Sequence, residues 1–132
     1  ASNRSALIRI PASRGMGTRT EVRCPDPTCN PYLAFAMMLC SGLDGVKNNL
    51  PTPEATNVDI FEMSAAEKVE AGIASLPANL LEAIQELKAN PIATEALGEH
   101  ILQKYIEGKE KEWDAFRTAV TDWEIDNYLS KY

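Results

Sequence analysis

Two prolines, Pro25 and Pro27, divide the chain into a short part with strand patterning and a long part with helical patterning. Proline cannot donate a backbone hydrogen bond, so the tripeptide Pro25-Asp26-Pro27 ends any strand that reaches it. Before it, apolar side chains recur at every second position, and after it they recur at helical spacing. The sequence therefore predicts an α+β fold, in which an N-terminal antiparallel β-hairpin precedes a mainly α-helical part.

The predicted hairpin has strands at 5–10 and 18–24, joined by a loop that contains Gly15 and Gly17. Side chains two positions apart lie on the same face of a strand. One face is then apolar, and we expect it to be buried as core. The other face carries charged side chains from both strands: Arg9, Arg19, Glu21 and Arg23.

The charge of this N-terminal part is opposite to that of the rest of the chain. Residues 1–23 hold five of the thirteen basic residues but only one of the nineteen acidic ones. All five are arginines, namely Arg4, Arg9, Arg14, Arg19 and Arg23, and the first lysine is Lys47. Guanidinium groups bind carboxylate and phosphate oxygens in pairs. The pattern indicates an anion site, and the alternative is a basic hairpin held by salt bridges.

A single carboxylate, Glu21, stands among these arginines. It is either neutralised by its neighbours, or it binds a cation while the arginines bind the anion that accompanies that cation. A metal-binding carboxylate beside phosphate-binding arginines is the combination that nucleotide chemistry requires. The pattern leaves both interpretations open.

Helix signals follow the prolines in regular order. Asn30 and Pro31 predict the start of a helix that reaches about Leu43 and is apolar nearly all round, so we expect further protein to cover it. Capping boxes predict that two later helices begin at Ser64 and Thr121. Helical spacing and the breaker Asn90-Pro91 predict two further helices, at 79–89 and about 91–120. In the long helix we expect the core face to hold Leu97, Ile101, Tyr105, Ile106, Trp113 and Phe116, and the solvated face to pair Glu107 with Lys111.

Composition narrows the class of protein. A chain of 132 residues suits one domain, and no apolar run is long enough for a bilayer. Three cysteines and the one histidine, His100, have no zinc spacing, so we expect free, mostly buried thiols and a structural histidine. The thiols and the absence of a visible secretory signal favour a cytoplasmic location.

Several motifs in fixed order carry a family resemblance. The segments 3–11 (NRSALIRIP), 18–23 (TRTEVR), 25–33 (PDPTCNPYL) and 42–48 (GLDGVKN) resemble successive elements of type I glutamine synthetases. The resemblance covers essentially the whole chain, but only the last third of such an enzyme. It implies that residues 1–132 are the C-terminal segment of that catalytic domain, with the hairpin at 1–24 and the helical part at 25–132.

The resemblance also implies roles in joining glutamate and ammonia, with ATP, through γ-glutamyl phosphate. Arg4 matches an arginine at the γ-phosphate and the substrate side chain, Arg9 one that binds ATP phosphates, and Arg19 a nucleotide-side arginine. Glu21 matches a ligand of the divalent metal, Mg²⁺ or Mn²⁺. Arg23 matches the arginine that faces the glutamate γ-carboxylate. The role of Arg14 stays open.

In the family the site forms between subunits of a double-ring dodecamer, and most metal ligands come from the upstream part. We therefore expect the isolated chain to be inactive. One alternative is a related ligase that joins glutamate to another amine. The other is a non-catalytic module that binds anions or nucleic acid, against which stand the isoelectric point of about 4.8 and the absence of aromatic residues between the arginines. We expect no nucleic-acid or membrane partner.

Overall fold

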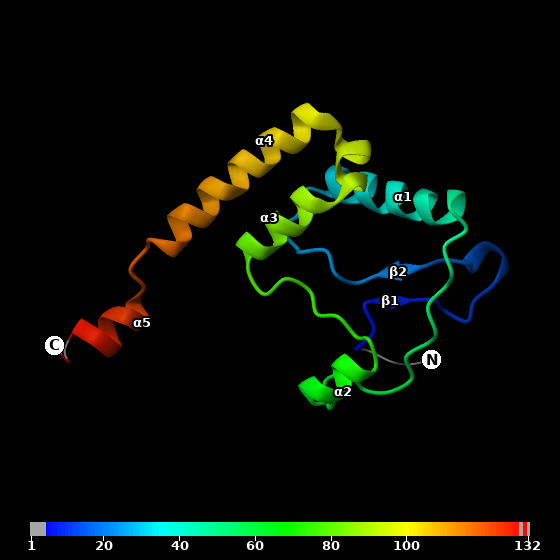
Figure 1. Ribbon diagram of the computed structural model, residues 1–132, viewed down its shortest axis with the longest axis horizontal. Coiled ribbons are helices and arrows are strands. Elements are labelled where there is room, and N and C mark those ends of the chain that lie inside the picture. The colour runs from blue at the N-terminus through cyan, green and yellow to red at the C-terminus, as the bar shows by residue number, and fades with distance from the viewer. Residues whose placement is uncertain (1–4, 130, 132) are drawn as a thin grey trace. The chain divides into compact units, whose positions relative to one another are not determined.

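The computed structural model describes residues 5–129 and 131, and these residues form two compact units (Figure 1). The first unit extends to Leu76 and the second begins at Pro77. The first holds the hairpin and two helices, and the second holds the remaining helices. The α+β class predicted from the sequence is confirmed. The organisation predicted for residues 1–132, as one segment divided after residue 24, stays a prediction.

The N-terminal hairpin consists of β1 (Ile8–Arg9) and β2 (Glu21–Val22), which pair antiparallel and lie side by side in Figure 1. Ile8 is opposite Val22, and Arg9 is opposite Glu21. Residues directly opposite each other point to the same face, so the predicted separation of apolar and charged faces is confirmed. The connecting loop contains a 3-10 turn, Gly15–Gly17, whose first residue has a φ of +65° that favours glycine.

The predicted strands were too long, and the predicted burial of their apolar face is wrong. Ile8 and Ile10 are both exposed, at 58% and 61%. A two-residue ladder forms little sheet surface, and burial needs a second layer on that surface. No element of the first unit supplies such a layer within the described residues.

Helix α1 (Pro31–Lys47) begins as predicted and ends four residues later than expected. The side chain of Asn30 accepts hydrogen bonds from the backbone N–H groups of Tyr32 and Leu33, and Pro31 occupies the first helical position. Lys47 in the last turn complements the partial negative charge of the helix C-terminus. The helix extends past Leu43 because neither Gly42 nor Gly45 takes the left-handed conformation that ends a helix.

A long connection leads from α1 to α2 (Ala65–Glu70). It is tied to the start of the hairpin where the backbone N–H of Ile60 donates to the hydroxyl of Ser5, at 3.1 Å. The predicted capping box is present, because Ser64 and Glu67 exchange hydrogen bonds between side chain and backbone. Gly72, with a φ of +65°, follows the helix and lets the chain turn away.

In the second unit, α3 (Leu80–Ala89) is followed directly by α4 (Pro91–Arg117). Asn90 ends the first helix and caps the second, accepting a hydrogen bond from the backbone N–H of Ile92. Helix α4 is interrupted at Gly98, whose φ of 73° and ψ of 153° are not helical. After this break the chain returns alongside α3 (Figure 1), and Lys88 of α3 forms an ion pair with Glu110 of α4.

The buried core of the second unit lies between α3 and α4. It comprises Ile84, Ala93, Leu97, Leu102 and Ile106. The prediction was right for Leu97 and Ile106 but wrong for Ile101 and Phe116, which are exposed. The break at Gly98 shifts the helical phase, so Leu102 replaces Ile101 on the face toward α3.

The solvated face of α4 carries ion pairs, but not the predicted one. Glu107 accepts from Lys104 at 2.8 Å and from Gln103 at 3.2 Å. These two hydrogen bonds, that from Lys104 foremost, lower the pKa of Glu107, whereas Lys111 acts on it only as a nearby charge. The i, i+3 partner thus replaces the expected i, i+4 partner.

The chain ends in α5 (Asp122–Glu124) and a π-helical turn, Ile125–Leu129. The predicted capping box of Thr121 and Glu124 is present. Trp123 and Tyr128 meet edge to face, with ring centroids 5.6 Å apart. This terminal segment therefore packs partly on itself.

The three cysteines are free, as predicted, but none of them is buried. Cys24 is exposed, and Cys29 and Cys40 are half-buried, because the first unit has no thick core to enclose them. None of the helices in the described part of the chain is both long and apolar enough to cross a membrane.

Candidate anion site on the hairpin

The candidate site lies on the charged face of the hairpin, where Arg9 and Glu21 are cross-strand partners. The Nη1 of Arg9 donates to Oε2 of Glu21 at 2.9 Å. Both side chains are partly shielded, with 37% and 28% of their surfaces exposed. The antiparallel register therefore brings together two charges that are twelve positions apart in sequence.

Arg19 reaches the same carboxylate from the other side. Its Nε and Nη2 donate to Oε1 of Glu21 at 3.0 and 2.6 Å. Its Nη1 also donates to the carbonyl oxygen of Gly17 at 3.2 Å, which holds the guanidinium against the loop. Arg19 lies two positions before Glu21 and outside β2, but its hydrogen bonds to Glu21 show that the two side chains share one face, as predicted.

The carboxylate of Glu21 is thus held on both oxygens by guanidinium groups. The hydrogen bonds from Arg19, and then those from Arg9, hold the pKa of Glu21 below its ordinary value. The two positive charges also lower the pKa of Glu21, whereas desolvation acts in the opposite direction and is outweighed by the other effects together. Glu21 is therefore ionised at neutral pH, and the trio keeps an excess of one positive charge.

Two further residues were predicted to belong to the site, Arg23 and Arg4. Arg23 directly follows β2, is exposed, and donates its backbone N–H to the carbonyl oxygen of Leu7 at 3.0 Å. This hydrogen bond continues the pairing of the hairpin one residue past the end of β2, so the backbone at position 23 follows the direction of the strand. Arg4, which the sequence also assigned to the site, lies outside the described residues.

Arg14, whose role the sequence left open, serves the loop. Its Nη1 donates to the carbonyl oxygens of Pro11 and Ser13 at 2.8 and 3.0 Å. These contacts fold the side chain back over its own turn. Pattern analysis missed this, because nothing in the spacing of arginines distinguishes a guanidinium that binds loop carbonyls from one that binds a ligand.

The geometry bears on the two interpretations of Glu21. The hydrogen bonds from Arg9 and Arg19 correspond to the first interpretation, in which neighbouring arginines neutralise the carboxylate of Glu21. A cation site needs more donors, since Mg²⁺ takes about six oxygen ligands. No cluster of three or more His, Cys, Asp or Glu side chains exists in the described ranges 5–129 and 131. By themselves these residues therefore do not fit a divalent metal.

An arrangement of this kind can exchange one anion for another. Guanidinium groups form the same paired hydrogen bonds with phosphate as with carboxylate. Both arginines are partly exposed, so a solvent-borne anion can approach them. The trio is therefore suited to bind phosphate or carboxylate groups in competition with Glu21.

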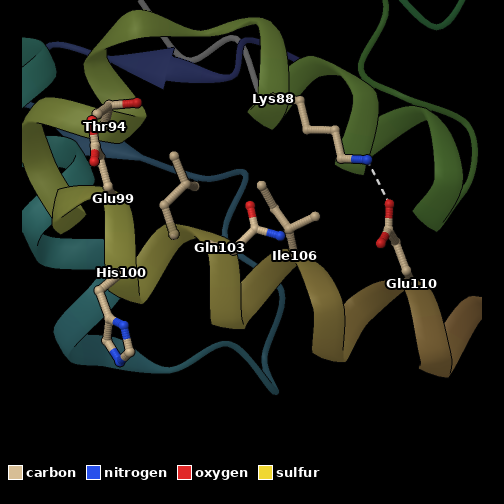
Figure 2. Close-up of a pocket in the computed structure, with 8 residues that line it drawn as sticks. Lys88, Thr94, Glu99, His100, Gln103, Ile106 and Glu110 are labelled. Carbon is tan, nitrogen blue, oxygen red and sulfur yellow. Dashed lines mark hydrogen bonds and ion pairs between the residues drawn. The ribbon is translucent and has the colours of Figure 1, made fainter.

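Sequence analysis also missed an open groove in the second unit, between α3 and α4. Leu102 and Ile106 line it with apolar surface, and the ion pair of Lys88 and Glu110 spans it (Figure 2). His100 is one of the lining residues, but its side chain extends away from that ion pair (Figure 2). The sequence did hold a signal for this groove, since Leu102 and Ile106 are four positions apart and follow Gly98. That spacing identifies the helix face toward α3 only once the break at Gly98 is known.

Comparison of the chain with known proteins identifies the family that it matches. The family model described as "Glutamine synthetase, catalytic domain" matches residues 1–128. The chain is 58% identical over 130 residues to a glutamine synthetase of Methanosarcina mazei, covering 98% of this chain and 29% of that protein. It is 48% identical over 132 residues to a glutamine synthetase of Thermus thermophilus, covering all of this chain and 30% of that protein.

A solved structure gives the same result for the fold. The structure titled "GmaS/ADP complex-Conformation 1" matches with a TM-score of 0.80 at 30% sequence identity. The match covers 98% of this chain and 28% of that one. The chain thus spans less than a third of the length of the relatives that it matches.

Proposed function

This chain belongs to the glutamine synthetase catalytic-domain family, and we propose that it is the C-terminal part of an ATP-dependent ligase that forms glutamine from glutamate and ammonia. The single observation that carries the proposal is the family match across residues 1–128. The geometry supports it, because two of the arginines that the family resemblance assigns to anions, Arg9 and Arg19, meet on one hairpin face at Glu21.

We assign the proposed roles one residue at a time. Arg9 binds phosphates of ATP, and Arg19 binds on the nucleotide side. Arg23 faces the γ-carboxylate of glutamate, and Arg4 lies at the γ-phosphate and the substrate side chain. Nucleotide binding is supported by the structural relative, whose title names ADP.

Glu21 is proposed as one ligand of Mg²⁺ or Mn²⁺. No group of three or more His, Cys, Asp or Glu side chains lies together among residues 5–129 and 131, so we propose that the remaining ligands come from the rest of the longer protein. When bound, such an ion neutralises phosphate charge. The metal-binding proposal therefore concerns the longer protein and not the 132-residue chain alone.

In the proposed reaction, the γ-carboxylate oxygen of glutamate attacks the γ-phosphorus of ATP and ADP leaves, which gives γ-glutamyl phosphate. Ammonia then attacks the γ-carbonyl carbon and inorganic phosphate leaves, which gives glutamine. Charge shifts onto phosphate oxygens in the first step. Preorganised arginines stabilise that charge, and positioning with charge neutralisation is the main source of rate in phosphoryl transfer.

The whole protein is proposed to act as a double-ring dodecamer in the cytoplasm, with glutamate, ammonia and ATP as its partners. The support for this assembly is the family membership. The acidic isoelectric point of about 4.8 supports the absence of a nucleic-acid partner.

The test compares the full-length protein with the 132-residue chain. Each is incubated with glutamate, ATP, Mg²⁺ or Mn²⁺, and either ammonium or a small primary amine, and the amide product and ADP are measured. We expect glutamine from the full-length protein and no product from the isolated chain. Product formed only with the amine would replace glutamine synthesis by γ-glutamyl-amide synthesis, and turnover by the isolated chain would show that its residues suffice.

A further inference from the structure

The N-terminal hairpin receives little support from the helices of its own unit. Each strand of its ladder is two residues long, and the apolar side chains of Ile8 and Ile10 are exposed. Within the described part of the unit, neither α1 nor α2 packs against either strand. Arginines that bind a ligand in pairs of hydrogen bonds must still be held in fixed positions, because such bonds depend on direction. A contact other than core packing must therefore hold the first strand in place.

One hydrogen bond joins this strand to the long connection between α1 and α2. The backbone N–H of Ile60 donates to the hydroxyl oxygen of Ser5 at 3.1 Å, across 55 positions of sequence. Both residues are half-buried. Two residues after Ser5, the carbonyl oxygen of Leu7 accepts the backbone N–H of Arg23 at 3.0 Å. The segment that leads into β1 is thus attached to the connection at one end and to the second strand at the other.

A turn in the connection presents the N–H of Ile60 to the hairpin. The next two N–H groups are used within the turn, since Phe61 donates to the Asp59 carboxylate at 3.0 Å and Glu62 donates to the Asp59 carbonyl at 3.2 Å. The N–H of Ile60 is directed to Ser5 instead. A backbone N–H that is partly shielded from water needs an acceptor, and the short serine side chain supplies one that holds the two backbones close together.

We propose that Ser5 is a positioning residue, whose hydroxyl fixes the strand that carries phosphate-binding arginines. Arg9 follows it by four residues, and Arg4 directly precedes it in the sequence. Ser5 itself does not contact the substrate, but acts on both arginines through the backbone. The inference rests on the proposed function for the roles of Arg4 and Arg9, whereas the tie between Ser5 and Ile60 follows from the contact.

Loss of the Ser5 hydroxyl should affect ATP and ammonia differently. Small displacements of groups that position reactants can lower a rate by about 100-fold. ATP binding and kcat should therefore fall, because both depend on arginines of this strand. Ammonia enters after phosphoryl transfer and does not bind these arginines, so the KM for ammonium should not rise. A hydrogen bond that only stabilises the fold would lower the melting temperature and leave ATP affinity and kcat as they are.

The experiment replaces Ser5 in the full-length protein by a matched pair, Ser5→Thr and Ser5→Val, which have the same shape and differ in the hydroxyl alone. Ser5→Ala is the second variant without a hydroxyl, and it adds no bulk should the larger side chains prevent folding. We expect Ser5→Val and Ser5→Ala to bind ATP about 3- to 10-fold more weakly in calorimetry. Their kcat should fall by about 10- to 100-fold. Ser5→Thr should remain close to the wild type in both.

A second measurement follows the tie itself. Hydrogen exchange of the Ile60 amide is measured by mass spectrometry of the full-length protein, with electron-transfer fragmentation of a peptide that covers residues 57–63. Exchange should be about 3- to 10-fold faster in Ser5→Val and Ser5→Ala than in the wild type, and nearly unchanged in Ser5→Thr. The amide of Glu67, which donates to the Ser64 hydroxyl in the same unit, is the control and should exchange equally in all variants.

Three results would overturn the positioning role of Ser5. The first is unchanged exchange at Ile60 when the hydroxyl is absent. The second is faster exchange with unchanged ATP affinity and kcat, and the third is an equal loss in Ser5→Thr and Ser5→Ala. The proposed function fails separately, when the unmodified full-length protein forms no glutamine. ATP affinity and exchange at Ile60 need no turnover, so they decide the role of Ser5 in that case too.

Discussion

At the scale of single residues, the position of one carboxylate decides how the hairpin behaves. Glu21 is ionised and shared between Arg9 and Arg19, whose remaining surface faces solvent. Exposed ion pairs of this kind contribute little to stability. These ion pairs instead hold the guanidinium groups of Arg9 and Arg19 in positions from which they can exchange Glu21 for another anion.

The first prediction separates Glu21 from Arg23 in the full-length protein. Glu21→Gln keeps the shape of the side chain but removes the charge that a cation needs. It should lower kcat and raise the metal concentration for half-activity, with less effect on the KM for glutamate. Arg23→Lys keeps the charge but loses the planar fork, so it should impair glutamate use and leave the metal requirement alone. Each loss should be about 30- to 1000-fold in rate.

Thr20→Val is the control for this pair, because Thr20 is on the other face of the strand in an alternating pattern. It should leave steady-state kinetics nearly unchanged. If Thr20→Val abolished activity while Glu21→Gln left the metal dependence as it was, the assignment of the charged face would be wrong.

The second prediction concerns pH. The hydrogen bonds from Arg19 and Arg9 lower the pKa of Glu21 in the folded chain. A lowered folded-state pKa means that the pairs stabilise the fold above the unfolded-state pKa, and that this stabilisation disappears as pH falls through the folded-state pKa. Carbon NMR titration of the Glu21 carboxyl should therefore show a midpoint below its ordinary value.

Arg19→Gln should move that midpoint upward, because it removes the larger of the two causes. Arg14→Gln removes the same charge from the same hairpin, but its guanidinium binds carbonyl oxygens of the loop. It should therefore leave the midpoint nearly unchanged. Equal shifts in both variants would show that general charge, and not the hydrogen bonds, sets the pKa of Glu21.

At the scale of elements, a few residues that begin or interrupt helices determine where the chain changes direction. Asn30, Ser64, Asn90 and Thr121 cap helices where their side chains accept backbone hydrogen bonds. Gly98 has the opposite function, because it interrupts α4 and lets the rest of the helix return along α3. The core of the second unit depends on this return, since its buried residues come from both helices.

The third prediction tests this break with a matched pair of substitutions. Gly98→Ala places a Cβ where φ is 73° and ψ is 153°, a conformation that essentially only glycine adopts. It should destabilise the second unit by about 1–3 kcal/mol. Gly108→Ala, on the same helix beyond the break, should stabilise it by about 0.5–1 kcal/mol. Urea denaturation followed by circular dichroism measures both, and changes of the same sign would contradict this account of the break.

At the scale of the whole molecule, the main feature is apolar surface that the described residues leave uncovered. Large side chains recur every three or four positions along α1 and are exposed: Tyr32, Phe35, Leu39, Leu43 and Val46. Such a stripe normally lies against other protein. Because the chain spans about 29% of its relatives, we expect the remainder of the full-length protein to cover it.

The fourth prediction compares one substitution in two settings. Phe35 is 67% exposed, so Phe35→Ser should change the unfolding free energy of the isolated chain by less than about 0.5 kcal/mol. In the full-length protein, where we expect the ring to be buried, it should cost about 3 kcal/mol. Ser41→Ala, on α1 but outside the stripe, should be nearly neutral in both. A cost that is equally small in both settings would show that α1 stays exposed.

Local hydrogen bonding explains what was predictable from the sequence. The caps at Asn30 and Ser64, the break at Asn90, and the two faces of the hairpin each depend on contacts within a few residues or on strand alternation. These signals survive in any tertiary setting, because they satisfy backbone groups that otherwise lack a partner. The family membership likewise followed from motifs in fixed order.

Contacts between distant residues explain what only the tertiary structure decided. That Glu21 has both oxygens on arginines, and that Arg14 binds its own loop, depends on side-chain positions that spacing cannot give. The core face of α4 depends on the break at Gly98, since one non-helical residue shifts the phase of every side chain after it. The length of the strands and the exposure of their apolar face depend on which layers are present, because burial belongs to a pair of surfaces and not to one segment.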